Sequence, residues 1–384
     1  MSSQKRIVIK IGSSLLADEE RLVPRYAFMH GLMSDIAALR EEGHEVVLTS
    51  SGAVALGLNA VGKTPKRAST LDKQAAAACG QPLLLNAYKQ VAQEFGFDIG
   101  QVLVTLDDME GRRRYLNIKN TILKLFDRDV MPIVNENDTV ATQELKVGDN
   151  DRLGAKVAQM IQADYLIILT SVDGLYDRNP SDDGAKLVET VEDVSAYLDV
   201  TSDVSDLGSG GMLTKIKAAN MAQNSGCVTL IGRGTNERPI LDLLSGKRPH
   251  TTCLAHTSPK SSFEVWLTDR LQVAGSLILD EEAATAVAEG NVGVEADQIA
   301  SLQGEFQKGD VVHLFDKEGT EIARGLSNFS SDEIVVLARD NDKKIVDLMG
   351  ERGDQEVVGA ENLVVLEDHH LAWEAPMQEV MKIA

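Results

Sequence analysis

The sequence predicts an α/β fold in three layers, helix, sheet and helix, with a mainly parallel sheet, followed by a small β-rich, barrel-like domain. From Met1 to about Gly246, short apolar runs alternate with longer stretches of helical spacing. Uninterrupted apolar strands separated by helices are typical of a parallel sheet that is covered on both faces. After about Lys247 this alternation stops, and glycine turns separate short strands instead.

The first part contains six apolar runs that we expect to be strands. One stretch between them carries Met29, Leu32, Met33 and Ile36, spaced as on one face of a helix. The six expected strands are Ile7–Ile9, Val46–Leu48, Val102–Val104, Ile133–Val134, Leu166–Leu169 and Val228–Ile231. The other expected helices cover Ala75–Val91, a segment with Tyr115, Ile118, Ile122 and Leu125, and a segment with Leu153, Val157, Met160 and Ile161.

The second part begins with a linker. The stretch from Arg248 to Ser262 is rich in Pro, Ser and Thr and has no apolar period, which predicts a linker. We place the first domain at residues 1–255, the linker at 256–272 and the second domain at 273–384. The clearest strands expected in the second domain are Val311–Phe315 and Ile334–Leu337.

Composition excludes several classes of protein. The 384 residues include 59 acidic and 38 basic side chains, so the formal net charge is −21. That charge disfavours a protein that mainly binds a phosphate backbone. No apolar run reaches the roughly 18 residues of a membrane span, and Met1–Lys10 is too short and polar for a secretory signal. Cys79, Cys227 and Cys253 form neither a disulfide framework nor a zinc ribbon. We therefore expect an acidic, soluble protein of the cytoplasm.

One motif is misleading. Gly57–Thr64 matches GxxxxGKT, the phosphate-binding P-loop. A P-loop leaves a strand directly and opens a helix, so that its N–H groups converge on phosphate. Here the preceding strand ends near Thr49, Ala53–Leu58 looks helical, and Pro65 follows the motif. A surface loop is the better interpretation.

Two expected strands end in small polar residues. Lys10 ends the first strand and is followed by Gly12, which allows close backbone approach. Ser50, Ser51 and Gly52 follow the second strand and open a helix. Ligands of open α/β sheets gather at such strand ends, and a helix start suits a phosphate or a carboxylate. Simple helix capping by serine explains the second segment equally well.

Two acid-rich loops lie further along. Asn135–Thr139 follows the strand at Ile133–Val134, and Val147–Asp151 opens the next helix. Turn and capping chemistry alone would account for Asp149 and Asn150. Because both loops adjoin strand ends, we interpret them as a hairpin-like lid over a site, with acids suited to an amino group or to lysines.

Glycines, hydroxyls and a lysine recur in a later pair of segments. Leu169–Tyr176 ends a strand in a tight turn, and Gly208–Lys215 leads into a helix. Backbone N–H donors, hydroxyls and one mobile cation are the components of a triphosphate site. A flexible interdomain loop is the alternative. No GxGxxG follows the first strand, so a dinucleotide site has no support.

Together these segments resemble the amino-acid kinase family, most closely the branch that phosphorylates glutamate. Asn135–Asp138 and Lys146–Asp151 separate this branch from sister kinases that act on aspartate, acetylglutamate, carbamate or uridylate. The region from Gly275 to Met349 resembles a PUA domain. The segments that carry the resemblance are Val8–Ser14, Thr49–Ala53, Val134–Asp138, Lys146–Asp151, Asp173–Tyr176, Gly208–Lys215, Gly275–Asp280 and Phe306–Val312.

The resemblance implies a role for each matching position. Lys10 and Lys215 would neutralise charge on the transferred phosphoryl group, and Asp151 would hold both lysines. The family commonly has Asp where Ser171 stands and a small residue where Leu213 stands. No protein residue is assigned to a metal. The implied glutamate-binding residues are Ser51, Gly52, Asp138 and Asn150, and the implied ATP-binding residues are Lys10, Gly12, Thr170, Ser171, Ser209, Gly210, Gly211, Met212, Leu213, Thr214 and Lys215.

The implied reaction is transfer of the ATP γ-phosphoryl group, with Mg²⁺, to the side-chain carboxylate of L-glutamate. The resemblance places this step at the start of proline synthesis, with proline as feedback inhibitor and a homo-oligomer as the assembly. A sister kinase with another carboxylate acceptor is one alternative. An RNA-binding protein is a second, but residues 275–350 contain 16 acidic and 6 basic side chains, a net charge of −10.

Overall fold

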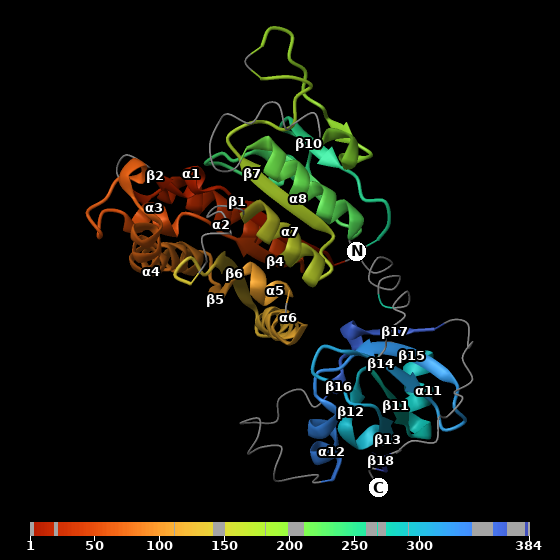
Figure 1. Cartoon of the computed structure of the whole chain (residues 1–384). Coiled ribbons are helices and arrows are strands. Elements are labelled where there is room, and N and C mark those ends of the chain that lie inside the picture. The colour runs from red at the N-terminus through yellow and green to blue at the C-terminus, as the bar shows by residue number, and fades with distance from the viewer. Residues whose placement is uncertain are drawn as a thin grey trace. The chain divides into compact units, whose positions relative to one another are not determined.

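Figure 1 shows a computed structural model of the chain, coloured along its length. The structure describes residues 4–18, 22–110, 112–140, 150–180, 182–198, 211–258, 267, 274–290, 292–339, 356–366 and 381–382. The chain divides into two compact units. The first contains Met1–Glu110 and Ile118–Ser262, and the second contains Gly111–Asn117 and Phe263–Ala384.

An eight-stranded sheet forms the centre of the first unit, in the order β5-β6-β4-β1-β7-β9-β10-β8. The five pairings among β5, β6, β4, β1, β7 and β9 are all parallel, and β10 runs antiparallel to β9. All six predicted strands are therefore present in a mostly parallel sheet. The strands are β1 (Arg6–Ile11), β4 (Glu45–Thr49), β5 (Asp98–Val104), β6 (Val130–Glu136), β7 (Tyr165–Thr170), β8 (Thr190–Val191), β9 (Val228–Arg233) and β10 (His250–Cys253).

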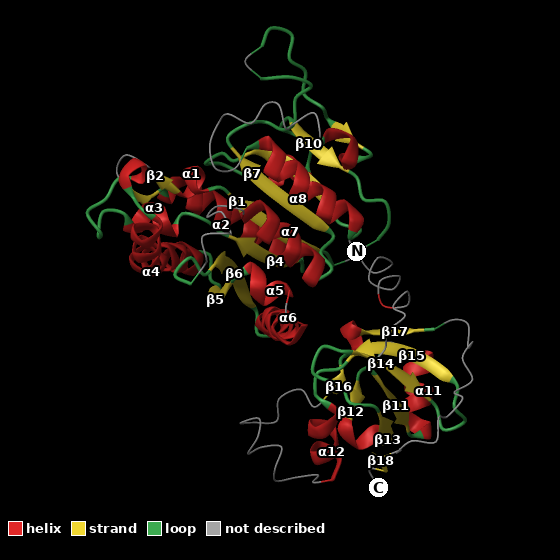
Figure 2. Cartoon of the chain, in the orientation of Figure 1, coloured by secondary structure: helices red, strands yellow, loops and turns green. Residues whose placement is uncertain are grey.

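Helices cover both faces of this sheet, which confirms the three predicted layers. Ile7, Ile9 and Ile11 of β1 belong to the same buried cluster as Met29 and other apolar residues of α2 (Tyr26–Glu41). Neighbouring strand residues point to opposite faces, so Lys10 faces the other layer, formed by α7 (Asn150–Met160) and α8 (Met212–Asn224). Figure 2 shows α7 and α8 side by side across that face.

The remaining helices include the predicted helical segments at Ala75–Val91 and Tyr115–Leu125. The long α4 (Thr70–Glu94) begins with a capping box, in which Ser69 and Asp72 bond each other's backbone N–H groups. Buried Leu84 and Tyr88 of α4 join the same cluster as α2. The shorter elements are α1 (Ser13–Leu16), β2 (Ala17–Asp18), β3 (Val23–Pro24), α3 (Ala53–Gly57), α5 (Leu106–Glu110), α6 (Arg112–Asp127) and α9 (Leu241–Leu244).

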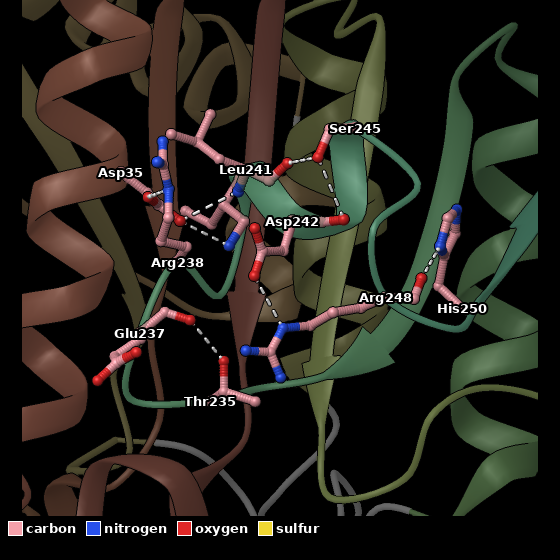
Figure 3. Close-up of polar contacts among 10 residues, drawn as sticks. Asp35, Thr235, Glu237, Arg238, Leu241, Asp242, Ser245, Arg248 and His250 are labelled. Carbon is pink, nitrogen blue, oxygen red and sulfur yellow. Dashed lines mark hydrogen bonds and ion pairs between the residues drawn. The ribbon is translucent and has the colours of Figure 1, made fainter.

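The loop after β9 lies directly on α2 (Figure 3). Oδ2 of buried Asp35 accepts hydrogen bonds from the backbone N–H groups of Ile240 at 2.9 Å and Leu241 at 3.0 Å. Nε of Arg238 lies 3.8 Å from Oδ1. At Gly31, one turn earlier in α2, a Cβ atom would lie 1.9 Å from the carbonyl oxygen of Asn236. Asp35 and Gly31 therefore set the path of this loop.

The prediction of a linker is wrong for its first residues. His250–Cys253 form β10, which pairs with β9 inside the sheet. Thr251 is buried, and its Oγ1 accepts a hydrogen bond from the N–H of Leu175 and donates one to the carbonyl of Val188. This polar segment forms a strand although it has no apolar period. The β-branched side chain of Thr251 suits a sheet, and its hydroxyl group has hydrogen-bond partners there.

The second unit is rich in β-structure, as predicted. Six strands form a sheet in the order β17-β15-β14-β11-β13-β18, and β12 pairs with β16. Apolar residues on one side of the sheet, including Leu277 and Leu314, make the core with helix α11 (Glu281–Glu289). The strands are β11 (Gly275–Leu279), β12 (Val294–Glu295), β13 (Ile299–Gln303), β14 (Val311–Phe315), β15 (Glu321–Leu326), β16 (Glu356–Val358), β17 (Leu363–Val365) and β18 (Met381–Lys382).

The strand predicted at Ile334–Leu337 is wrong, because these residues lie in helix α12 (Ser331–Arg339). Ser330 and Glu333 form a reciprocal capping box at its start. Ile334, Val335 and Leu337 are buried, whereas Val336 is 42% exposed. A short apolar run is ambiguous between strand and helix, and here the cap decides for the helix.

Candidate active site

The carboxyl ends of β1, β4, β6 and β7 meet at one edge of the sheet, because these strands are parallel. Strands β4 and β6 lie on one side of β1, and β7, which follows them in the sequence, lies on the other side. Such a reversal of strand order is where open α/β sheets bind ligands. Lys10, Thr49, Asn135 and Thr170 all lie at this edge.

Two lysines and one aspartate form the centre of the site. Nζ of Lys10 lies 2.6 Å from Oδ1 of Asp151, and Nζ of Lys215 lies 3.2 Å from Oδ2. Oγ1 of Thr214 donates a hydrogen bond of 2.6 Å to Oδ2. Lys10 and Lys215 are each 5% exposed and Asp151 is 1% exposed. The structure thus brings together the three residues predicted as catalytic, from β1, α7 and α8.

The electrostatics of this cluster favour an ionised aspartate. Burial acts to raise the pKa of Asp151, but the charges of Lys10 and Lys215, with the hydrogen bonds from Lys10 and Thr214, act more strongly. The pKa of Asp151 therefore lies below its usual value. With both lysines charged, the cluster carries a net charge of +1, which suits a multiply charged anion.

A glycine in α7 makes this arrangement possible. A Cβ atom at Gly154 would lie 3.2 Å from Cβ of Lys10 and 3.4 Å from its Cγ. Gly154 comes one helical turn after Asn150 and Asp151, so the absence of a side chain lets this turn of α7 pack against the base of Lys10. The sequence interpretation missed Gly154, although an isolated glycine within a helical pattern is a signal of close packing.

Asn150, at the start of α7, joins the segment that follows β4. Its Nδ2 donates hydrogen bonds of 2.7 Å to the carbonyl oxygen of Ser50 and to Oγ of Ser51. Gly52 has a φ of +98°, a value that favours glycine, and it directly precedes α3. The predicted residues Ser51, Gly52 and Asn150 are therefore neighbours.

Apart from Oδ1 of Asp151, which is ion-paired with Lys10, two buried polar atoms in this region have no hydrogen-bond partner within the described part of the chain. They are Oδ1 of Asn150 and Oγ1 of Thr49. Thr49 pairs with Lys10 in the β1–β4 register, so both side chains point to the α7 face. The sequence interpretation did not single out Thr49. Buried polar atoms are normally satisfied, so these two atoms are suited to a bound polar molecule.

Asp138 follows β6 and is not bonded to the other predicted residues. No hydrogen bond or ion pair joins its carboxylate to any residue that the structure describes. Burial raises the pKa of Asp138 to about 6. A partly buried carboxylate without a partner among the described residues is suited to a cationic group. The lid predicted across residues 135–151 lies partly outside the described residues, since 141–149 are not among them.

The start of α8 provides the other half of the site. Gly211 precedes the helix without a side-chain cap, and a Cβ atom there would meet nothing within 4 Å. Met212 and Leu213 follow and are half-buried. Uncapped N–H groups at the start of a 13-residue helix, beside Lys215, favour an anion. Ser209 and Gly210 lie outside the described residues.

Other residues predicted to bind ATP lie at the ends of β1 and β7. Gly12 precedes α1 without a side-chain cap, and Thr170 is buried at the end of β7. Ser171 is exposed. An ion pair that the sequence interpretation missed joins Nε of Arg233 to Oδ1 of Asp173 at 2.7 Å. It ties the turn after β7 to the end of β9.

The GxxxxGKT motif leads from α3 toward α4. Its Lys63 is exposed and lies 3.4 Å from Asp72, an acid at the start of α4. The motif begins at the end of α3 and not at the end of a strand. Backbone N–H groups converge on phosphate from a strand-to-helix turn, which this motif lacks. The predicted surface loop is therefore confirmed.

Neither a membrane helix nor a metal cluster is found within the described ranges. None of the described helices has the length and apolar character needed to cross a membrane. No group of three or more His, Cys, Asp or Glu side chains is placed there to hold a metal ion.

Comparisons with known proteins match both units. The amino acid kinase family matches residues 5–232, and the PUA domain matches residues 275–349. The glutamate 5-kinase of Laribacter hongkongensis is 40% identical over 367 residues, which cover 95% of this chain and 98% of that protein. The glutamate 5-kinase of Caldanaerobacter subterraneus is 39% identical over 365 residues, covering 94% and 98%.

The glutamate 5-kinase of Rhodospirillum rubrum is 38% identical over 361 residues, or 93% of this chain and 96% of that protein. Among solved structures, carbamate kinase from Giardia lamblia aligns with a TM-score of 0.47 and 17% identity, over 66% of this chain and 100% of that chain.

Proposed function

Since this chain belongs to the glutamate 5-kinases of the amino acid kinase family, we propose that its buried lysine–aspartate cluster transfers the γ-phosphoryl group of ATP to the side-chain carboxylate of L-glutamate. The observation that carries this proposal is Asp151 between Lys10 and Lys215. Beside it lie the hydrogen-bonded pair Ser51 and Asn150 and the start of α8 at Gly211, which has no side-chain cap.

The reaction needs no general base. A glutamate side chain with a pKa of about 4.3 is already ionised at neutral pH. The barrier is the repulsion between an anionic nucleophile and an anionic phosphate, so catalysis depends on positioning and on charge neutralisation. Lys10 and Lys215 provide two cations, one at each carboxylate oxygen of Asp151. Asp151 keeps their ammonium groups in place before the substrates bind.

Ser51, Gly52, Asn150 and Asp138 form the proposed glutamate side. Oδ1 of Asn150 and the Asp138 carboxylate are acceptors without a donor among the described residues, and an ammonium group offers three N–H donors. The Ser51 hydroxyl and the N–H groups after Gly52 suit the substrate carboxylate. Glutamate carries both groups, so it complements this half of the site.

The nucleotide side comprises Gly12, Thr170, Ser171 and the segment 209–215. The N–H groups at the start of α8 and the Lys215 ammonium group fit the phosphates of ATP. Because no cluster of metal ligands is found within the described residues, we propose that Mg²⁺ arrives with the ATP phosphates, as magnesium commonly does. The ion would neutralise phosphate charge; the lysines and helix N–H groups orient the same phosphates.

Membership of the family supports further proposals. We propose proline as a feedback inhibitor, a homo-oligomer as the assembly and the cytoplasm as the location. Domain boundaries at residues 255 and 273 complete this proposal. RNA binding by the second unit is disfavoured, because the net charge of −10 over residues 275–350 repels a polyanion.

A substrate panel tests the proposed function. ADP release should require ATP, Mg²⁺ and L-glutamate, and chelation of the metal should abolish it until Mg²⁺ is restored. Aspartate, N-acetylglutamate, carbamate and UMP serve as alternative acceptors. Turnover with one of these instead of glutamate would identify a sister kinase and contradict the proposal.

A further inference from the structure

We propose that Gln81 and Tyr88, two residues of α4 to which neither the family nor the motifs assign a role, are positioning residues for the amino-acid acceptor. The inference deepens the proposed function and rests on it. Gln81 and Tyr88 are seven residues apart, so they lie two turns apart on one side of the helix. Each one bonds a strand-end residue that in turn contacts Asn150.

Tyr88 sets the conformation of the segment after β4. Its side chain is fully buried, and its hydroxyl lies 2.9 Å from Oγ of Ser50. Oγ of Ser50 donates to the carbonyl oxygen of Ser51 at 3.2 Å, so the Tyr88 hydroxyl is the donor to Ser50. This chain of bonds fixes the backbone around Ser50, whose carbonyl oxygen accepts from Asn150.

Gln81 sets the orientation of the Asn135 amide. Nδ2 of Asn135 donates to Oε1 of Gln81 at 2.8 Å, so the other end of the amide, Oδ1, faces the opposite way. Oδ1 accepts from the N–H of Glu136 at 2.9 Å and lies 3.4 Å from Nδ2 of Asn150. A flipped Asn135 would set its Nδ2 against the backbone N–H of Glu136, so that N–H and Oε1 of Gln81 together hold the observed orientation.

The two contacts converge on the amide of Asn150. Its Nδ2 faces three oxygens, from Ser50, Ser51 and Asn135, so its Oδ1 must point away from them. Oδ1 is the buried atom that has no partner within the described residues. It is thereby held as an acceptor for the substrate ammonium group, the part of an amino acid that offers several N–H donors.

Close packing keeps α4 at the required distance. At Gly80, next to Gln81, a Cβ atom would lie 1.9 Å from the carbonyl oxygen of Ala53 in α3. At Gly57 a Cβ atom would lie 1.8 Å from the carbonyl oxygen of Ala76 in α4. Helix α3 begins directly after Ser51 and Gly52. Helix α4 therefore supports this segment through its backbone packing on α3 and through the side chains of Gln81 and Tyr88.

Steady-state kinetics of single substitutions test the proposal. Tyr88→Phe removes only the hydroxyl, and Gln81→Leu removes the acceptor at similar size. Each should raise the KM for glutamate about five- to tenfold, the effect of one lost hydrogen bond, and change kcat and the KM for ATP less than twofold. Gln81→Glu keeps an acceptor oxygen toward Asn135 and should restore a KM within about twofold of the unsubstituted protein.

Leu84→Ala is the matched control, because Leu84 lies between the two residues on α4, is buried in the apolar cluster and is a purely apolar side chain. It should lower the melting temperature without changing the KM for glutamate. An equal KM change in Leu84→Ala, an unchanged KM in both test variants, or a parallel rise in the KM for ATP would overturn the proposal. Failure of the proposed function would instead show in the unsubstituted protein, as an absence of glutamate-dependent ADP release.

Discussion

Oδ1 of Asp151 lies 2.6 Å from Nζ of Lys10, and both side chains are almost fully buried. One carboxylate at the start of α7 thereby holds a lysine from the central strand, while its second oxygen holds Lys215 from α8. Breaking a buried ion pair by removing one partner is strongly destabilising, because the remaining charge is left unpaired. The cluster therefore links stability to catalysis, and both are measurable.

Asp151→Asn should lower kcat at least 100-fold and destabilise the protein by about 3–5 kcal/mol, because two buried ammonium groups lose their counterion. ADP release and urea unfolding measure the two effects. The exposed acid Asp183 provides the control, and Asp183→Asn should change neither quantity. Adding Lys10→Met to Asp151→Asn should recover part of the stability, because only Lys215 then lacks its counterion, and should not recover activity. Recovery of both would show that the cluster is structural only.

Lys215→Ala should reduce kcat by about 100-fold or more and leave the KM for glutamate within a few-fold. A cation directed at charge that develops on the phosphoryl group acts mainly in the transition state, so its loss affects kcat. Lys63→Ala is the matched control, since Lys63 belongs to the exposed loop with the GxxxxGKT pattern. A comparable loss of kcat in Lys63→Ala would restore the P-loop interpretation.

The kcat/KM for glutamate should fall as the pH is lowered through about 6, because burial raises the pKa of Asp138 to about 6. Protonation removes the charge that we assign to the substrate ammonium group. Asp138→Asn should raise the KM for glutamate about tenfold or more and abolish this pH dependence, with the KM for ATP unchanged. A rise in the KM for ATP would place Asp138 on the nucleotide side.

The same residue should affect stability with the opposite pH trend. The pKa of Asp138 is about 6 when folded, against a usual value of 3.8. Between these values the folded state holds a proton that the unfolded state has lost, so the free energy of unfolding falls as pH rises through this range. Asp138→Asn should therefore stabilise the protein above pH 6 and have little effect below pH 4. Chemical unfolding at both pH values measures the difference.

Asp35→Ala should destabilise the protein by about 2–4 kcal/mol, because the N–H groups of Ile240 and Leu241 lose their acceptor. The KM for either substrate should change little, since Asp35 makes no contact with the lysine–aspartate cluster. Ser34→Ala, at the exposed neighbouring position in α2, is the control and should stay within about 0.5 kcal/mol. A loss below 1 kcal/mol for Asp35→Ala would mean that the loop does not depend on this carboxylate.

A chain ending at Ala255 should retain glutamate-dependent ADP release, because every described residue that we assign to the reaction belongs to the first unit. Its melting temperature should be lower, since residues 111–117 belong to the second unit and include buried Leu116. Activity and thermal unfolding are measured side by side with the full chain. A folded but inactive product would show that catalysis requires both units.

Much of the architecture follows from local patterns. Apolar spacing in Met29, Leu32, Met33 and Ile36 identified α2, and six apolar runs identified strands of the sheet. The same reasoning failed at Ile334–Leu337, where the capping box of Ser330 and Glu333 makes a helix. It also failed at His250–Cys253, where hydroxyl partners elsewhere in the chain make a strand. Both failures involve short segments whose local pattern fits more than one structure.

By itself, the sequence determined which residue types stand at the strand ends and helix starts, because turns, caps and periodicity act over a few residues. Lys10, Ser51 and Asn150 were identifiable on that basis. The family resemblance implied that Asp151 holds Lys10 and Lys215, and the tertiary structure brings the three side chains together. Only the tertiary structure decided that Gly154 lets α7 pack against the base of Lys10, and that Gln81 and Tyr88 bond Asn135 and Ser50. These relationships join residues far apart in the chain, and they depend on the order of strands and the packing of helices, which no local pattern encodes.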